Sequence, residues 1–379
     1  VSADNFELSE EQVPESNRGK LIISCRSHYF PTMTQQVQML TGHDREPIKA
    51  DDYQALIMLP FNEEQIRSYF SQYLNQHGHG QSVDEILALI RSIHNLSELT
   101  QRAYLLSQIV EEIDWLESMK AKGEVVCGVT IYQRLVERWL ERDHGKHRFS
   151  REHKVILMET IAAAMWQDGA AEWPWSKVEA WLDYFLYEHP RIARRYDRYD
   201  PAVLNEDFRT STFVLRPDNS KEHFRFAHRS LQEYFLARYL YRAMEQHEPT
   251  CWQIGTISEE TLDFVLQLHL TQQSEKASAC WQSWLETNQP QVTLTMFKLW
   301  LMAVKKQLPR PNPTGFDLRG EDLSEWIIGG TAEDRLRLPG FKADGACMVQ
   351  TKLEYINLQS ASLREIDGRL MQVQQANLN

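Results

Sequence analysis

The chain has 379 residues, of which 42% are hydrophobic and 25% are charged, with 41 basic against 53 acidic side chains. This composition is typical of a globular protein of two or three domains, and it excludes collagen, a disordered tail and a disulfide scaffold. The net charge of −12 argues against an electrostatically driven binder of nucleic acid or anionic membranes, because either needs a basic footprint. No apolar run approaches the ~18–20 residues that a membrane-spanning helix needs.

The cysteines and the two ends of the sequence carry further expectations. Five cysteines are scattered along the chain without CxxC spacing, which predicts free thiols in a reducing cytoplasm and no structural zinc. The sequence begins at Val1 and ends at Asn379 within a periodic pattern. We therefore expect both ends of the sequence to be cut from a longer protein.

The first zone, up to about residue 80, reads as α/β structure. Two short apolar runs at 21–24 and 56–59 predict buried strands, and a helix follows Asn62, which forms a capping box with Gln65. Arg26 lies directly after the first run. Ligands of open α/β sheets bind beyond the carboxyl ends of strands, so Arg26 is either a phosphate ligand or a surface arginine that begins a loop.

The second zone, up to about residue 308, has helical periodicity almost throughout. Ser82 with Glu85 predicts one helix start and Ser150 predicts another. The runs 212–215 and 223–226 flank a turn-like segment and predict a β-hairpin. Ser230 with Glu233 then predicts the start of the next helix, and helices followed by a two-stranded wing indicate a winged-helix module.

Three groups of side chains in this zone could carry chemistry. His228 precedes a helix N-terminus, where an imidazole can donate to an anion; the alternative is a half-buried histidine satisfied by the hairpin. Two histidine pairs have metal-ligand spacing but lie in polar connections without acidic or cysteine partners, so we expect no metal site: His77 with His79, and His144 with His147. Four arginines could contact phosphate or a partner, but they alternate with aspartates, which favours a solvated surface: Arg191, Arg194, Arg195 and Arg198.

The third zone comes after a proline-rich linker at 309–313 and shows apolar residues at every fifth position. The register misses at Glu333 and Gly368, and a second apolar set lies two positions before the first. A period of five fits neither a helix nor a strand; it predicts a right-handed quadrilateral β-helix of roughly three coils, at about 20 residues per coil. The pattern resembles that of pentapeptide-repeat proteins. The first set is Leu318, Leu323, Ile328, Leu338, Met348, Leu353, Leu358, Leu363, Val373 and Leu378.

Three ordered motifs between about residues 18 and 240 resemble the NACHT-type STAND nucleoside triphosphatases, a class of signalling ATPases. The string F-x-H-x-S-x-Q-E-Y-F-x-A at 226–237 is similar to the winged-helix signature of that class. The segment at 20–30 with Ser24-Cys25-Arg26 resembles its sensor-1 strand, and 59–69 resembles the segment that comes after this strand in the class. The segment 94–106 resembles the nucleotide-facing helix of its small helical domain.

The resemblance implies roles for three residues. Arg26 would read the γ-phosphate, and His228 would hold the β-phosphate of bound ADP and lock the closed state. Ala103 stands where the class has a proline against the adenine. The sequence contains neither a G-x-x-x-x-G-K-[ST] loop (Walker A) nor an acidic Walker B strand, both of which precede sensor 1 in the class. ATP or ADP with Mg²⁺ is therefore expected only in the intact parent protein, an NTPase that hydrolyses acid anhydrides.

We accordingly expect a multidomain, mainly α-helical fold. Its parts are the C-terminal edge of an α/β NTPase domain (1–80), a helical domain (81–150), a winged-helix domain (151–245), a helical linker domain (246–310) and the β-helix (311–379). The expected function is the switch and sensor portion of a bacterial STAND ATPase in defence or stress signalling. It would bind a protein trigger through its C-terminal domains and oligomerise on activation.

The alternative is a non-enzymatic adaptor whose repeats bind a protein partner or mimic a DNA duplex. Mimicry needs a strongly acidic face, whereas residues 316–379 hold 10 acidic and 7 basic side chains. That mild excess favours protein–protein sensing.

Overall fold

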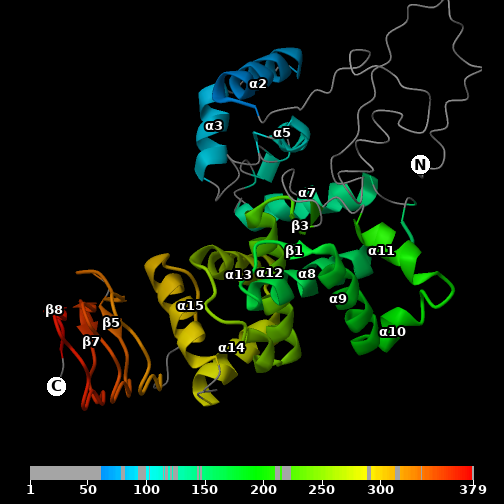
Figure 1. The fold of residues 1–379 in the computed structure, drawn as a ribbon. Helices are drawn as coiled ribbons and strands as arrows, with labels where there is room; N and C mark the ends of the chain where they lie inside the picture. Colours follow the sequence, from blue (N-terminus) through cyan, green and yellow to red (C-terminus); the bar gives the residue numbers. More distant parts are fainter. Residues whose placement is uncertain are drawn as a thin grey trace, which may run out of the picture.

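The computed structural model describes most of the chain after residue 60. The described residues are 61–77, 82–92, 100–101, 103–113, 115, 118–119, 122, 127–142, 145, 147–209, 214–215, 223–287, 292–311, 316–333 and 335–377. The strands predicted at 21–24 and 56–59 lie outside them, as does Arg26, so the expected edge of an α/β domain is not part of the described structure. The described part of the chain is mainly helical (Figure 1).

Short helices form the N-terminal part of the described structure: α2 (Glu63–His77), α3 (Val83–Ser92), α5 (Ala103–Glu111) and α7 (Gly128–Arg142). Two of the predicted capping boxes are confirmed here. The Gln65 amide N–H donates to Asn62 Oδ1 at 2.9 Å, and the Ser82 N–H donates to Glu85 Oε2 at 2.8 Å. These caps satisfy backbone donors that the first helical turn leaves without a partner.

The middle of the chain combines helices with one small antiparallel sheet. The helices are α8 (Arg151–Gln167), α9 (Trp175–Glu188), α10 (Pro190–Ala193) and α11 (Pro201–Arg209). Strands β2 (Val214–Leu215) and β3 (His223–Phe226) pair as the predicted hairpin does, and β1 (Trp173–Pro174) adds a third strand, in the order β1-β3-β2. Strand β1 was not predicted, because two residues carry no periodicity. The Ser150 side chain caps α8 as predicted, accepting from the His153 N–H at 3.3 Å.

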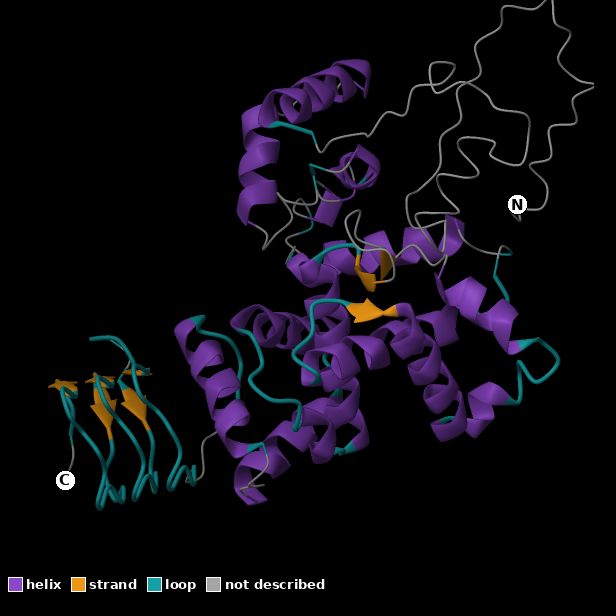
Figure 2. Ribbon diagram, viewed as in Figure 1, coloured by secondary structure: helices purple, strands orange, loops and turns teal. Residues whose placement is uncertain are grey.

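Helix α12 (Arg229–Gln246) lies at the centre of the helical region. It packs against α8, α13 (Glu259–Gln272) and α14 (Glu275–Thr287), and the short 3-10 helix η5 (Pro249–Trp252) follows it. Four tryptophans of this region are buried in the core: Trp252, Trp281, Trp284 and Trp300. Helix α15 (Thr293–Lys305) then lies between these helices and the C-terminal strands (Figures 1 and 2).

The prediction of a right-handed quadrilateral β-helix at the C-terminus is wrong. Five strands of two or three residues form two small parallel sheets, in the orders β4-β6-β8 and β5-β7, and neither sheet closes or curls. The strands are β4 (Ile327–Gly329), β5 (Leu336–Arg337), β6 (Lys352–Glu354), β7 (Ile356–Asn357) and β8 (Gln372–Gln374).

The backbone torsions of the turns explain why the strands of this region are short. Non-glycine residues with positive φ recur along this region, among them Gln350 (φ 58°) before β6, Tyr355 (φ 49°) between β6 and β7, and Ser360 (φ 64°) after β7, and they interrupt the extended backbone. The periodic positions from Leu318 to Leu358 are buried as expected, whereas Leu363 is only partly buried and Val373 is 43% exposed. The pattern therefore identified the buried side chains but not the extent of the sheets.

The register of the parallel pairs explains why the periodicity misses at Glu333. Ile328 pairs with Leu353, 25 positions later, whereas Leu353 pairs with Val373, only 20 positions later. Leu336 likewise pairs with Ile356 at a separation of 20. Five additional residues therefore lie between β4 and β5, and the miss at Glu333 falls within them.

Gly329 provides a test of this pairing. A Cβ at this position would lie 2.1 Å from the carbonyl oxygen of Glu354, the residue opposite it in β6. We expect Gly329→Ala to lower the free energy of unfolding by about 2 kcal/mol, because the two backbones must separate. At Gly368 the nearest atom would be 3.6 Å away, so Gly368→Ala is the matched control and should change stability by less than about 0.5 kcal/mol. Urea unfolding measures both; equal losses would contradict the close approach.

Candidate functional site

The candidate site is built around His228, where strand β3 leads into helix α12. His228 is the N-cap residue of this 18-residue helix, with extended φ of −152° and ψ of 149°. Its Nδ1 accepts the Ser230 backbone N–H at 3.1 Å. The prediction that Ser230 with Glu233 caps this helix is therefore wrong. The imidazole occupies the capping position and lies at the positive end of the helix dipole.

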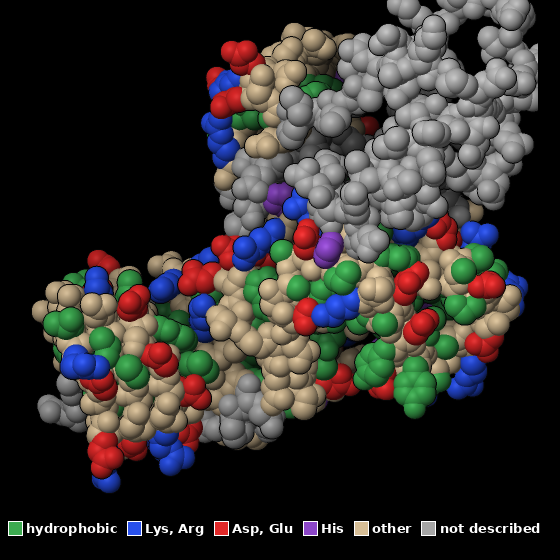
Figure 3. Space-filling model, viewed as in Figure 1, with side chains coloured by type: hydrophobic (Ala, Val, Ile, Leu, Met, Phe, Trp, Pro, Cys, Tyr) green, Lys and Arg blue, Asp and Glu red, His purple; other side chains and the backbone are tan. Residues whose placement is uncertain are grey.

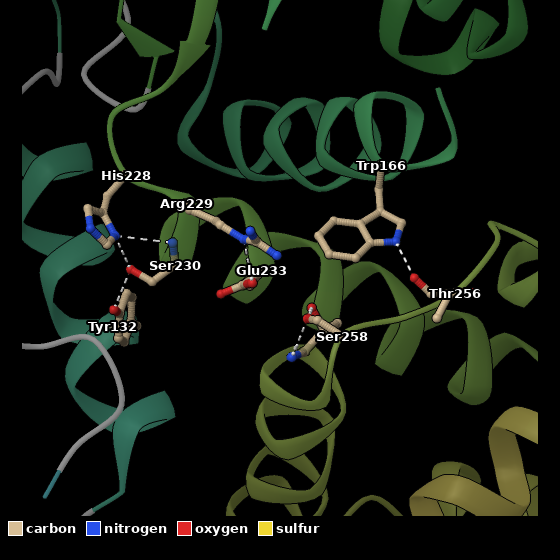
Figure 4. A network of polar contacts seen from close by, with 9 residues as sticks. Tyr132, Trp166, His228, Arg229, Ser230, Glu233, Thr256 and Ser258 are labelled. Carbon is tan, nitrogen blue, oxygen red and sulfur yellow. Dashed lines mark hydrogen bonds and ion pairs between the residues drawn. The ribbon is translucent and has the colours of Figure 1, made fainter. Parts of the chain in front are cut away.

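Ser230 has another role, because its side chain joins His228 to helix α7. The Tyr132 hydroxyl donates to Ser230 Oγ at 2.6 Å, and Ser230 Oγ lies 2.6 Å from His228 Nδ1 (Figure 4). Tyr132 and Ser230 are both fully buried. With the Ser230 hydroxyl and backbone N–H both directed at Nδ1, that nitrogen is an acceptor. The neutral ring therefore carries its proton on Nε2.

Aromatic rings from three helices hold Tyr132 in place. Tyr132 of α7 stacks on Tyr234 of α12, with ring centroids 5.5 Å apart, and meets the edge of Phe264 of α13 at 5.2 Å. All three rings are buried, and burial raises the pKa of Tyr234 above its usual value. This packing fixes the position of the Tyr132 ring. Its hydroxyl is therefore held in place for the hydrogen bond to Ser230.

Two groups of charged side chains surround the start of α12 and its inner face. Arg229 Nε donates to Glu233 Oε1 at 3.1 Å, within the first turn of the helix (Figure 4). Further along, the carboxylate of Glu159 on α8 receives Arg238 at 2.8 Å and Arg242 at 2.8 Å. The Glu159 side chain is only 4% exposed, so this carboxylate ties α8 to α12 in a region of low dielectric.

The structure describes the side chain of only one of the three predicted site residues. His228 lies at the start of α12, whereas Arg26 lies outside the described residues. Ala103 is the first residue of α5, and the position of its side chain is not described. Tyr132, which sequence reasoning missed, lies 98 positions from the residue it contacts. No local pattern marks a single tyrosine on the buried face of a helix.

The histidine pairs with metal-ligand spacing are only half described. His77 Nδ1 lies 2.9 Å from the Tyr73 carbonyl oxygen, and His147 Nδ1 lies 2.9 Å from the Lys154 ammonium. His79 and His144 fall outside the described residues. Within the described part of the chain, no cluster of three or more His, Cys, Asp or Glu side chains could hold a metal ion.

Comparison with known proteins adds no relative. Neither a protein-family model nor a curated protein matches the chain. Over the residues that the structure describes, no helix combines the length and apolar character required to cross a bilayer.

Proposed function

We propose that this chain is the switch and sensor portion of a NACHT-type STAND signalling ATPase, with His228 as the residue that senses bound nucleotide. The observation that carries the proposal is the position of His228. It ends the antiparallel β2–β3 hairpin and caps a long buried helix, within the 226–237 string on which the resemblance rests.

The donor set at this position fits a phosphate oxygen. Nδ1 of His228 accepts from Ser230, so the ring carries its proton on Nε2. The backbone N–H groups at the start of α12 contribute positive potential next to it. The buried hydrogen-bond chain already holds the imidazole on one side. The ring therefore loses little conformational entropy when it binds an anion, which favours a role in anion binding.

The same hydrogen-bond chain supports a two-state switch. His228 caps α12, whereas Tyr132 lies on α7, so a movement of α12 relative to α7 would strain the Tyr132–Ser230 contact. In the closed state His228 would hold the helical core against the nucleotide-binding domain of the parent protein. A trigger that binds the C-terminal region would release it, permit exchange of ADP for ATP with Mg²⁺, and lead to oligomerisation.

A cytoplasmic location belongs to the same proposal. The described cysteines are all free thiols: Cys127, Cys251, Cys280 and Cys347. Thiols of this number and spacing are typical of a reducing compartment.

The test is ADP titration by calorimetry of the parent protein, as wild type and as His228→Ala. One charge-assisted hydrogen bond to a phosphate is worth about 1.5–3 kcal/mol, so we expect the Kd for ADP to rise on the order of 10- to 100-fold. His223→Ala is the matched control, because His223 lies on strand β3 of the same hairpin and is also half-buried. Its Kd should stay within about twofold of wild type.

Two outcomes would contradict the proposal. An unchanged Kd in His228→Ala would remove His228 from nucleotide sensing. A parent protein without measurable affinity for ADP or ATP would favour a non-enzymatic adaptor that binds a protein partner through its C-terminal region.

A further inference from the structure

Helix α15 is attached both to the C-terminal strand region and to helix α13. The centroid of its Phe297 ring lies 4.6 Å from that of Phe316 and 5.7 Å from that of Phe341. At the C-cap of α15, the Lys306 ammonium pairs with the Asp263 carboxylate of α13. A displacement of the C-terminal region would therefore reach α15 through packing and α13 through this ion pair.

The Asp263 carboxylate has a second partner, which leads to helix α7. Gln267 Nε2 donates to Asp263 Oδ2 at 3.0 Å, whereas Lys306 binds Oδ1. Gln267 Oε1 accepts the Val129 N–H, in the first turn of α7, at 2.9 Å. A backbone N–H only donates and a carboxylate only accepts, so both contacts require the same orientation of the Gln267 amide. We call this series of contacts the hydrogen-bond relay: Lys306, Asp263, Gln267 and Val129.

The hydrogen-bond relay ends on the turn of α7 that carries Tyr132. Val129 lies three positions before Tyr132 on α7, which is about one helical turn. On α13, Phe264 likewise lies three positions before Gln267. The Tyr132 ring meets the edge of Phe264, with centroids 5.2 Å apart, and both rings are buried. One turn of α13 therefore holds one turn of α7 at two points, a polar contact on its first amides and an apolar contact on Tyr132.

Tyr132 continues the path to the candidate site. Its hydroxyl donates to Ser230 Oγ, which lies 2.6 Å from His228 Nδ1 (Figure 4). We propose that Gln267 is a positioning residue for His228, because it couples the position of α15 to the position of the Tyr132 hydroxyl. The inference rests on the proposed function of His228, and it adds the route by which a trigger at the C-terminal region would reach that residue.

The contacts of Gln267 go beyond what helix capping requires. A cap on α7 needs only the amide oxygen of Gln267, yet its amide nitrogen is held by a carboxylate that Lys306 also binds. Loss of the ion pair would leave Asp263 free to turn away, and Gln267 would then lose the charge-assisted hydrogen bond that orients its amide. The relay therefore makes the first turn of α7 sensitive to the end of α15.

The test measures the nitrogen NMR resonance of His228 Nδ1 in the 379-residue chain, without nucleotide, and assigns it by its loss in His228→Ala. This resonance responds to the hydrogen bonds that Nδ1 accepts. Tyr132→Phe removes the donor to Ser230 and defines the direction of the change. We expect Gln267→Leu and Lys306→Gln to move the resonance in that same direction, by less than Tyr132→Phe does.

Lys298→Gln is the matched control, because it makes the same change of charge on the same helix outside the relay. The Lys298 ammonium lies 4.0 Å from Glu259, the first residue of α13. Basic and acidic side chains are interspersed on the face drawn in Figure 3, so the loss of one positive charge changes the long-range field little. We expect this variant to leave the His228 resonance at its wild-type position.

Gln267→Glu separates capping from coupling. Its carboxylate can still accept the Val129 N–H, where the α7 dipole favours an anion, but it repels Asp263. We expect it to move the His228 resonance as Lys306→Gln does. Wild-type behaviour of Gln267→Glu would show that Gln267 only caps α7 and would overturn the proposal.

Two further results would overturn it. One is a wild-type His228 resonance in Gln267→Leu, and the other is equal displacement of the resonance by Lys306→Gln and Lys298→Gln. Lys306 is 46% exposed, so Lys306→Gln removes only a surface ion pair and should leave the fold intact. The comparison of the two lysine variants therefore decides the question even where a substitution of Gln267 impairs folding.

ADP titration of the parent protein gives a second readout. Gln267→Leu should raise the Kd for ADP about three- to tenfold, because the imidazole is less well positioned, and should have no further effect in the presence of His228→Ala. An equal rise in both backgrounds would mean that Gln267 does not act through His228 and would overturn the proposal. A parent protein without affinity for ADP would contradict the proposed function instead, and the NMR comparison would still decide the coupling.

Discussion

Replacing Phe297 by alanine is expected to lower the free energy of unfolding by about 3–5 kcal/mol, the usual cost of removing a buried aromatic ring. Phe297 of α15 is fully buried and contacts rings from the C-terminal strand region. Its centroid lies 4.6 Å from Phe316, 6.1 Å from Trp326 and 5.7 Å from Phe341. The cavity would open where α15 meets the first turns of that region, so both should loosen together.

Urea unfolding gives the total loss, and amide hydrogen exchange locates it. Exchange should accelerate at 316–333 and in α15, and change little in α8, which lies in a different part of the helical region. Phe297→Leu is the control, because it keeps most of the buried volume; it should cost less than about 1.5 kcal/mol. A loss below about 1 kcal/mol for the alanine variant would mean that α15 and the strands are not packed through this ring.

Glu159→Ala should cost about 3 kcal/mol, because it leaves Arg238 and Arg242 without their shared carboxylate. Both guanidinium groups are more than a quarter exposed, at 27% and 28%, so water compensates part of the loss. Thermal unfolding monitored by circular dichroism measures the effect.

Glu152→Ala is the matched control on the same helix, because Glu152 is exposed and should change stability by less than about 0.5 kcal/mol. Glu159→Gln preserves the size of the side chain and should fall between the two. Equal stability of Glu159→Ala and wild type would contradict a structural role for this carboxylate in joining α8 to α12.

Local chemistry in the sequence was a sound guide wherever the partners lie within a few residues. The Asn62–Gln65 and Ser82–Glu85 boxes and the 212–226 hairpin need only short-range hydrogen bonds, and each was predicted in place. The same reasoning failed at Ser230, where the pattern of a capping box was present. There the hydroxyl is used by Tyr132 and His228, and only a long-range contact reveals that competition.

In the C-terminal region, too, the sequence predicted one feature correctly and another wrongly. The period of five correctly identified the buried positions from Leu318 to Leu358, because burial follows from hydrophobicity and spacing, but it failed at Val373, which is 43% exposed. Strand length depends instead on backbone torsions, and the positive φ of Tyr355 separates β6 from β7. Hydropathy carries little information about such torsions when the residues are not glycine.

Periodicity, composition and charge by themselves determined that this is a mainly helical chain with an acidic excess and a proline-rich linker before its last region. The tertiary structure alone decided where that charge is neutralised. Arg238 and Arg242 share the buried Glu159, 79 and 83 positions away in sequence, whereas Arg194 and Arg198 have no carboxylate partner in the described structure, although Asp197 is their neighbour in sequence. Ion pairing depends on distances of a few ångströms between side chains, and folding sets those distances independently of separation along the chain.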